Sequence, residues 1–262
     1  MSPPPDELLA LADAAADLVV PRLHDALRRR DLASQTKSSA TDMVTEFDRW
    51  SEATIVEAIR AARPDDGFLG EEGARADGSS GVVWLIDPID GTTNFVYDLP
   101  GCSVSIGAAV DGVVVAGVVH DLVRAERFRA TAGGGATRDH EPIAVSGLGE
   151  LATALVATGF SYDAVRRRAQ AEALAVVLPA VRDIRRLGGA AVDLCALACG
   201  RVDAYYERGL QPWDTAAGVL VATEAGAVVD DRSAVGGALV GATPAIADGF
   251  FSLVDTAGGH RA

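Results

Sequence analysis

The chain has 262 residues, 49% of them hydrophobic, and its formal net charge at pH 7 is −14. This length fits one large domain or two that share a core, and the negative charge disfavours binding to nucleic acids and anionic membranes. The first residues lack the basic region of a signal peptide, and no uncharged apolar stretch is long enough to cross a bilayer. We therefore expect a cytoplasmic protein with neither a nucleic-acid nor a membrane partner.

Helices and an antiparallel sheet are expected in the first half of the chain. Apolar residues recur at helical spacing over residues 6–30 and 48–62, and Pro21 predicts a kink or break in the first helix. Short apolar runs predict strands at residues 82–86, 104–110, 113–120 and 143–145. Asp111-Gly112 lies between two of these runs and is typical of a hairpin turn.

The second half alternates strands with helices, a pattern typical of a parallel or mixed sheet. The expected strands are residues 155–158, 181–187, 204–207, 228–229 and 239–242. The expected helices are residues 162–178, 190–199, 215–225 and 243–254. The change of pattern predicts a boundary near residue 146, with an N-terminal α+β domain (1–145) that carries a metal site and a C-terminal α/β domain (146–262) that completes it.

The segment that follows Trp84 has the most informative chemistry. An apolar strand ends at Asp87, Pro88 restricts Asp87 to an extended conformation, and Asp90 follows three residues later. Both carboxylates can therefore face one crevice at the end of the strand, where they would attract Mg²⁺. The Gly-Thr-Thr sequence that follows offers N–H groups to a phosphate at the start of a helix. The alternative is an ordinary Asp-Gly turn with a threonine cap.

Two further acids are candidates because of their surroundings. Glu71 lies in a Gly-Glu-Glu-Gly sequence, which considered alone indicates an exposed loop. Asp214 follows Pro-Trp at the start of an expected helix, where it could be a simple N-cap. Beside Asp87 and Asp90, we treat both as candidate metal ligands. None of the four histidines lies in these motifs, so nothing supports a phosphohistidine or Ser-His-Asp mechanism.

The motifs Gly-Glu-Glu, Trp-x-x-Asp-Pro-x-Asp-Gly-Thr and Trp-Asp-x-Ala-Ala-Gly, in this order, resemble the inositol monophosphatase family, and its inositol-1-monophosphatase branch in particular. The resemblance implies a layered αβαβα sandwich, with an antiparallel-rich N-terminal sheet, a smaller mixed or parallel C-terminal sheet, and helices beside both. It also implies Mg²⁺ as cofactor, with two to three ions per site, lithium sensitivity and a homodimer.

The resemblance further assigns metal ligands. Glu71, Asp87 and the Ile89 carbonyl would hold one ion. Asp87, Asp90 and Asp214 would hold a second, and Glu71 would also contact a weaker third ion. These roles suit a phosphatase because two neighbouring cations can stabilise the attacking and leaving oxygens together.

Catalytic and substrate-binding roles come from the same resemblance. Thr92, paired with Asp48, would orient a metal-activated water, with Glu71 as a further catalytic residue and no covalent intermediate. The residues that would contact the substrate are Lys37, Asp90, Gly91, Thr92, Thr93, Ala190, Glu207 and Asp214.

The expected activity is Mg²⁺-dependent hydrolysis of a sugar or polyol phosphate monoester, with myo-inositol 1-phosphate as the first candidate. The metal motifs equally suit fructose 1,6-bisphosphate, phosphoadenosine phosphate, NADP or histidinol phosphate, because specificity depends on the rest of the pocket. A non-catalytic role in protein interaction is the alternative from a different class.

Overall fold

The computed structural model describes residues 3–29, 34–36 and 43–258. Its α-helices are α1 (Pro5–Arg29), α2 (Glu46–Ala62), α3 (Thr92–Tyr97), α4 (Ala164–Val177), α5 (Ala190–Ala198), α6 (Pro212–Glu224) and α7 (Ala247–Thr256). The strands of the first half are β1 (Ser34–Thr36), β2 (Met43–Thr45), β3 (Gly67–Gly70), β4 (Arg75–Ala76), β5 (Val82–Asp90), β6 (Ser103–Val110), β7 (Val113–Asp121), β8 (Glu126–Thr131), β9 (Gly135–Arg138) and β10 (Glu141–Pro142). Those of the second half are β11 (Leu155–Thr158), β12 (Asp183–Arg185), β13 (Ala204–Arg208), β14 (Val228–Asp231) and β15 (Ala238–Ala242).

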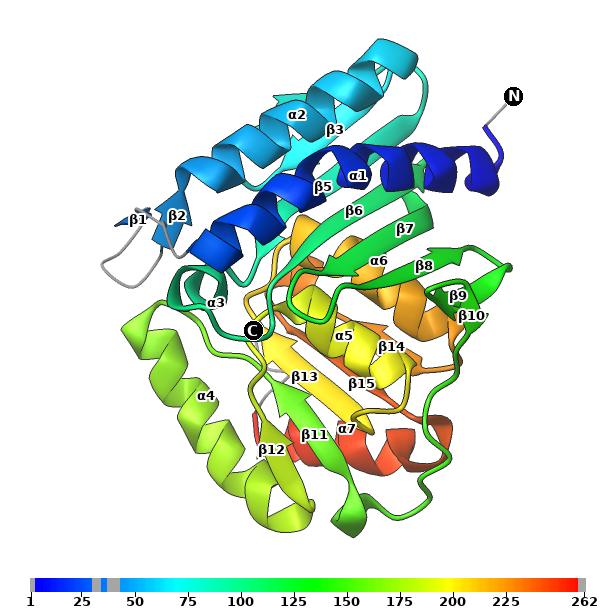
Figure 1. The fold of residues 1–262 in the computed structure, drawn as a ribbon. Helices are drawn as coiled ribbons and strands as arrows, with labels where there is room; N and C mark the ends of the chain where they lie inside the picture. Colours follow the sequence, from blue (N-terminus) through cyan, green and yellow to red (C-terminus); the bar gives the residue numbers. More distant parts are fainter. Residues whose placement is uncertain (1–2, 30–33, 37–42, 259–262) are drawn as a thin grey trace.

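Helices and sheets alternate in layers, as expected (Figure 1). Helices α1 and α2 cover the outer face of the larger sheet, and α5 and α6 lie between the two sheets. Helices α4 and α7 cover the outer face of the smaller sheet. The result is the αβαβα sandwich that the family resemblance implied. No described helix is long and apolar enough to cross a membrane.

The larger sheet has the order β10-β9-β8-β7-β6-β5-β3-β4, and its pairs are antiparallel except for the parallel pair β3–β5. The smaller sheet has the order β12-β11-β13-β15-β14, in which β12, β11 and β13 are parallel and β15 is antiparallel to both of its neighbours. An antiparallel-rich sheet and a smaller mixed sheet are therefore both confirmed.

Helix α6 packs unusually close to the larger sheet because glycines face it. A Cβ atom at Gly107 of β6 would lie 2.9 Å from the Ala216 side chain, and one at Gly117 of β7 would lie 2.9 Å from the Ala217 backbone. Real Cβ atoms do not approach other atoms so closely. These glycines therefore let α6 bring its N-terminus, which carries Asp214, to the carboxyl end of β5.

Some local expectations were wrong. Helix α1 continues through Pro21, so a break there is excluded, while a kink stays a prediction. Residues 143–145 are not a strand; the nearest strand is β10, although Val145 N donates to the Ala225 carbonyl across the layers. Strands β3, β4, β8 and β9 were not expected, and several helix limits differ by two or three residues. Separate domains on either side of residue 146 stay a prediction.

Candidate active site

Asp87 and Asp90 lie in the last four residues of strand β5. The strand pairs in register with β6 as far as Asp87, and the register shifts between Asp87 and Asp90. Such an irregularity redirects side chains, and here both carboxylates reach the same cleft. The Ile89 N–H donates to Asp87 Oδ1 over 3.1 Å, which fixes the turn around Pro88. The side chains are buried, with exposed fractions of 2% and 7%.

The N-terminus of helix α5 contacts the Asp90 carboxylate. The Ala190 N–H donates to Asp90 Oδ1 over 3.1 Å, and the Ala191 N–H donates to Asp90 Oδ2 over 2.8 Å. A Cβ atom at Gly189 would lie 2.5 Å from Asp90 Oδ2, so this contact requires glycine. Burial raises the pKa of Asp90 to about 6, even though the two N–H bonds lower it. Asp90 therefore joins the larger sheet to the helix layer.

Asp214 and Glu71 reach the cleft from other elements. Asp214 is the third residue of α6 rather than its N-cap, and its Oδ2 accepts the N–H of the capping residue Gln211 over 2.7 Å. Glu71 follows β3, in a loop held by the buried Glu52, which accepts the N–H groups of Glu72 and Ala74 over 2.8 Å each. Both side chains are half-buried in the structure.

Thr92 and Asp48 form a pair behind the turn. Thr92 Oγ1 lies 3.0 Å from Asp48 Oδ1 and 3.0 Å from the Ile89 carbonyl oxygen. Asp48 is fully buried in the first turn of α2, where its Oδ2 accepts the Thr45 N–H over 2.7 Å and the Thr45 hydroxyl over 2.5 Å. Burial raises the pKa of Asp48 to about 6, and the bonds from Thr45 oppose the shift.

Glu207, on strand β13, also lines the cleft. The hydroxyl of the fully buried Tyr205 donates to Glu207 Oε2 over 2.8 Å. Burial raises the pKa of Glu207 to about 7, while the Tyr205 bond and the charge of Arg186 lower it. A Cβ atom at Gly159 would lie 1.9 Å from the same carboxylate, so glycine leaves room for it. Glu207 is thus an acceptor fixed at one end of the cleft.

One cleft of about 410 Å³ unites most of the expected residues. Those on its lining are Glu71, Asp87, Ile89, Asp90, Gly91, Thr92, Ala190, Glu207 and Asp214. Asp48 and Thr93 are not on the lining; Asp48 touches Thr92, and Thr93 Oγ1 lies 3.3 Å from the Tyr162 hydroxyl. Lys37 lies outside the described residues. Acids that are up to 143 positions apart, from Glu71 to Asp214, therefore meet in one place.

The donor chemistry of this cleft fits a hard cation. Burial raises the pKa of Asp87 well above its usual value, and the charges of Glu71, Asp90 and Asp214 raise it further. The pKa of Asp214 is raised in the same way. A divalent ion would relieve this mutual repulsion, and carboxylate and carbonyl oxygens are its preferred ligands. Within the described ranges, however, no three Asp, Glu, His or Cys side chains already form a finished metal-binding group.

Comparison with known proteins decides the family. The model of the inositol monophosphatase family matches residues 5–249. The inositol-1-monophosphatase SuhB of Mycobacterium tuberculosis (strain ATCC 25618 / H37Rv) is 48% identical over 231 residues, which are 83% of this chain and 80% of that protein. The chain belongs to the inositol monophosphatase family. This confirms the resemblance, and membership indicates a phosphatase that acts on a small phosphate ester with a divalent metal cofactor.

Two further relatives are a solved structure with the same fold and a protein named as a Nus factor. The structure of the extragenic suppressor protein SuhB from Bartonella henselae has a TM-score of 0.88 and 32% identity, and the match covers 95% of this chain and 98% of that one. The Nus factor SuhB of Pasteurella multocida (strain Pm70) is 41% identical over 225 residues, 83% of this chain and 84% of that protein.

Several residues of the site were not expected from the sequence. Glu52 lies one helical turn after Asp48, and this i, i+4 spacing on a buried helix face was an available indication. Gly189 and Tyr205 matter only through contacts that tertiary structure creates. Arginines from three elements also line the cleft, and no motif indicated them.

Proposed function

We propose that the chain is a Mg²⁺-dependent phosphatase that hydrolyses a phosphate monoester of a sugar or polyol, with myo-inositol 1-phosphate as its first candidate substrate. The observation that carries this proposal is the convergence of four carboxylates in one cleft, opposite a fixed acceptor at Glu207. The name of the Mycobacterium tuberculosis relative supports the choice of substrate.

Metal binding is assigned to the acids at the carboxyl end of β5. Glu71, Asp87 and the Ile89 carbonyl would hold one Mg²⁺, Asp87, Asp90 and Asp214 a second, and Glu71 a weaker third. Ions bound there would supply positive charge to the phosphate oxygens and make water a stronger nucleophile. Two backbone N–H groups already hold the Asp90 carboxylate in place without a bound ligand, so the site is preorganised for metal binding.

Thr92 and Asp48 would orient the attacking water. Because the Asp48 carboxylate accepts the hydroxyl hydrogen of Thr92, the lone pairs of Thr92 Oγ1 are left to accept a hydrogen from water in the cleft. Asp48 thus acts as a positioning residue. Glu71, on the cleft lining, would help to hold the water in place.

Substrate binding would use both ends of the cleft. The N–H groups of Gly91, Thr92 and Thr93 would bind the phosphate at the start of α3, beside Asp90 and Asp214. Glu207 and the backbone of Ala190 would contact the polyol hydroxyls, which suits a carboxylate that can accept hydrogen bonds. Lys37 is proposed as a further contact on the family resemblance alone.

The test is phosphate release from myo-inositol 1-phosphate with and without Mg²⁺, in wild type and Asp90→Asn. We expect activity only with Mg²⁺, and a loss of roughly a hundredfold or more in the variant because a negatively charged ligand of the metal ion is removed. Asp77→Asn is the matched control, because Asp77 is exposed and lies outside the cleft. Near wild-type turnover in Asp90→Asn would reject the metal-ligand role. Inhibition by lithium is expected in the same assay.

The substrate itself needs a panel, because the metal ligands do not discriminate among phosphate esters. Fructose 1,6-bisphosphate, phosphoadenosine phosphate, NADP and histidinol phosphate are the alternatives. A kcat/KM for any of them well above that for myo-inositol 1-phosphate would replace the first candidate.

A role in protein interaction is the second candidate function, favoured by the relatives that carry the name Nus factor SuhB. A partner that co-purifies equally with wild type and Asp90→Asn would support it.

We also propose a homodimer. The exposed apolar side chains of Tyr97, Leu99 and Val123 are compatible with a contact surface, and sedimentation equilibrium would measure the mass.

A further inference from the structure

Asn94 lies where three segments of the chain meet beside the cleft. It belongs to α3 and directly follows residues 91–93, which are proposed to bind the phosphate. Its side-chain amide donates to the carbonyl oxygens of Pro100 and Leu187, which are 6 and 93 positions away. The side chain is buried, with an exposed fraction of 7%, and does not line the cleft itself. Asn94 therefore connects the phosphate-binding turn to the segment that leads into α5.

Glycines on both sides of this amide allow the three segments to pack closely. Gly188 has a φ of 132°, and a Cβ atom there would lie 2.0 Å from Asn94 Nδ2. Gly101 has a φ of 97°, and a Cβ atom there would lie 2.2 Å from the Leu187 carbonyl oxygen. Backbone packed this closely excludes water, so its carbonyl groups need a donor from the protein. Asn94 supplies that donor.

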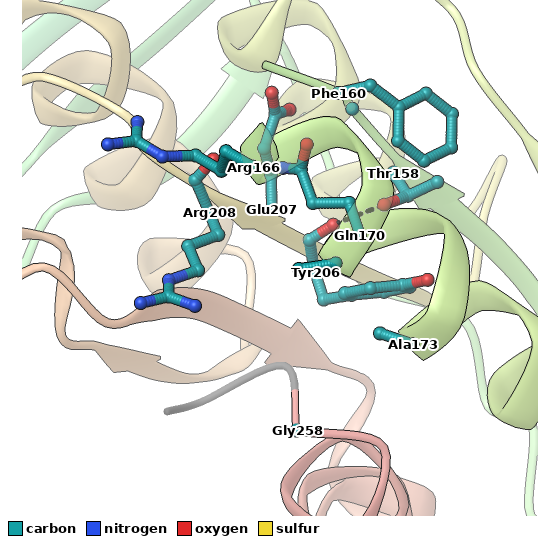
Figure 2. A pocket seen from close by; sticks show the side chains of 11 residues that line it. Thr158, Phe160, Arg166, Gln170, Ala173, Tyr206, Glu207, Arg208 and Gly258 are labelled. Carbon is teal, nitrogen blue, oxygen red and sulfur yellow. Dashed lines mark hydrogen bonds between the residues drawn. The ribbon is translucent and has the colours of Figure 1, made fainter. Parts of the chain in front are cut away.

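The two segments that Asn94 joins would contact different parts of the substrate. Residues 91–93 are proposed to bind the phosphate, whereas Gly188 lines the cleft and Ala190 is a proposed contact of the polyol hydroxyls. Figure 2 shows Glu207, the other proposed hydroxyl contact, which projects from β13. The distance between the phosphate and the hydroxyl contacts therefore depends on how the segment before α5 is held.

Asp90 and Asn94 hold neighbouring parts of this segment. Asp90 accepts the N–H groups of Ala190 and Ala191 at the start of α5, and Asn94 holds the carbonyl group of Leu187 just before it. These two residues flank the phosphate-binding turn in the sequence. Their bonds therefore give the turn and the start of α5 a fixed separation.

We propose that Asn94 is a positioning residue that sets the separation between the phosphate-binding turn and the hydroxyl contact at the start of α5, and so makes the cleft selective for the alcohol part of its substrate. This rests on the proposed phosphatase function. A polyol phosphate must reach both contacts at once, so a small shift between them would weaken its transition-state contacts. An ester without hydroxyl groups would bind through its phosphate and lose little.

The competing explanation is that Asn94 only stabilises the fold. A loss of folded protein would lower activity on every ester alike, whereas a change in separation would affect some esters more than others. The experiment therefore measures kcat/KM with Mg²⁺ for myo-inositol 1-phosphate, fructose 1,6-bisphosphate and p-nitrophenyl phosphate, whose ring carries no hydroxyl groups. The variants are Asn94→Ala and Asn94→Ser, which keeps one donor on a shorter side chain.

Thr243→Val is the matched control. It also removes a buried side-chain donor to a distant carbonyl group, that of Ser146, and Thr243 does not line the cleft. Its three kcat/KM values should keep the ratios of wild type even if its melting temperature falls.

We expect Asn94→Ala to lower kcat/KM roughly tenfold or more for the polyol and sugar esters, and no more than about twofold for p-nitrophenyl phosphate. Asn94→Ser should show a smaller loss with the same selectivity. Equal losses on all three esters would overturn the positioning role while leaving the phosphatase proposal intact. If thermal melting shows that Asn94→Ala is not folded, the ratios in Asn94→Ser decide. If wild type releases no phosphate from any of the three esters, the phosphatase proposal itself fails.

Discussion

Asp48 influences the cleft only through Thr92, since it does not line the cleft itself. Its second oxygen is fully used by Thr45, so only Oδ1 remains for the threonine of the site. An ionised carboxylate accepts the Thr92 hydroxyl hydrogen more strongly than the neutral acid does. Its raised pKa of about 6 then makes the pair sensitive to mildly acidic conditions.

We predict that Asp48→Asn lowers kcat roughly a hundredfold with little change in KM, because a positioned proton acceptor is lost. In wild type, kcat should fall as the pH drops through about 6, where Asp48 becomes protonated. Thr45→Ala removes the hydroxyl bond, one of the two Thr45 bonds that lower this pKa, so its acidic limb should move to higher pH. A pH–rate profile that is the same in all three proteins would contradict the role of Asp48.

The sequence predicted single residues well where one short segment contains the geometry. Asp87, Pro88 and Asp90 specify a turn that aims two acids together, and the structure places both in the cleft. The sequence itself does not reveal that Asp90 needs glycine at position 189, because that requirement arises between residues about 100 positions apart. The arginines were missed for the same reason, since each lies on a different element.

At the scale of elements, the close packing of helix α6 on strands β6 and β7 determines the position of Asp214 in the cleft. We predict that Gly107→Ala lowers the free energy of unfolding by roughly 1–3 kcal/mol, because its Cβ would meet the Ala216 side chain at 2.9 Å. Gly249→Ala is the control: it lies inside α7 with its nearest neighbour 3.6 Å away, so it should be neutral or stabilising by up to about 1 kcal/mol. Urea unfolding measures both, and equal stability of the two variants would refute the close-packing argument.

The longer helices and strands were predicted, whereas short strands such as β3 and the mixed-polarity strand β8 were not. Strand β8 alternates Arg127 and Arg129 with apolar residues, and these arginines pair with Asp13 more than 110 positions away on α1. A strand whose polar side chains are satisfied by a distant helix gives only a weak signature in a short window. Pro21 does not end α1, which is one continuous helix from Pro5 to Arg29.

For the molecule as a whole, two histidines link α1 to the larger sheet. The rings of His24 and His120 meet edge to face, with centroids 5.7 Å apart. Burial lowers the pKa of His120 from 6.5 to about 4, and the charges of Arg127 and His24 lower it too; the pKa of His24 is also lowered. The folded protein therefore keeps both rings neutral at a pH where an unfolded chain would bind protons.

At these two histidines the unfolded state binds more protons between pH 6.5 and 4, so their contribution to the free energy of unfolding should fall as the pH drops through this window. The raised pKa values of Asp48, Asp90 and Glu207 contribute with the opposite sign. We expect the His120 share of this loss to be on the order of 3 kcal/mol. His120→Gln should lose less stability than wild type as the pH drops through this window, whereas His140→Gln, at an exposed histidine, should follow wild type. Denaturant unfolding at several pH values gives the slopes, and identical slopes in the two variants would rule out the buried pair as the cause.

The bonds from Ala190 and Ala191 to Asp90 have a consequence for synthesis. During translation, Asp90 emerges from the ribosome about 100 residues before Ala190 and Ala191, whose N–H groups hold its carboxylate. The carboxylate therefore lacks these two bonds until the second half of the chain has been made. The complete active-site cleft can then form only after the second half of the polypeptide has been synthesised and has packed against the first.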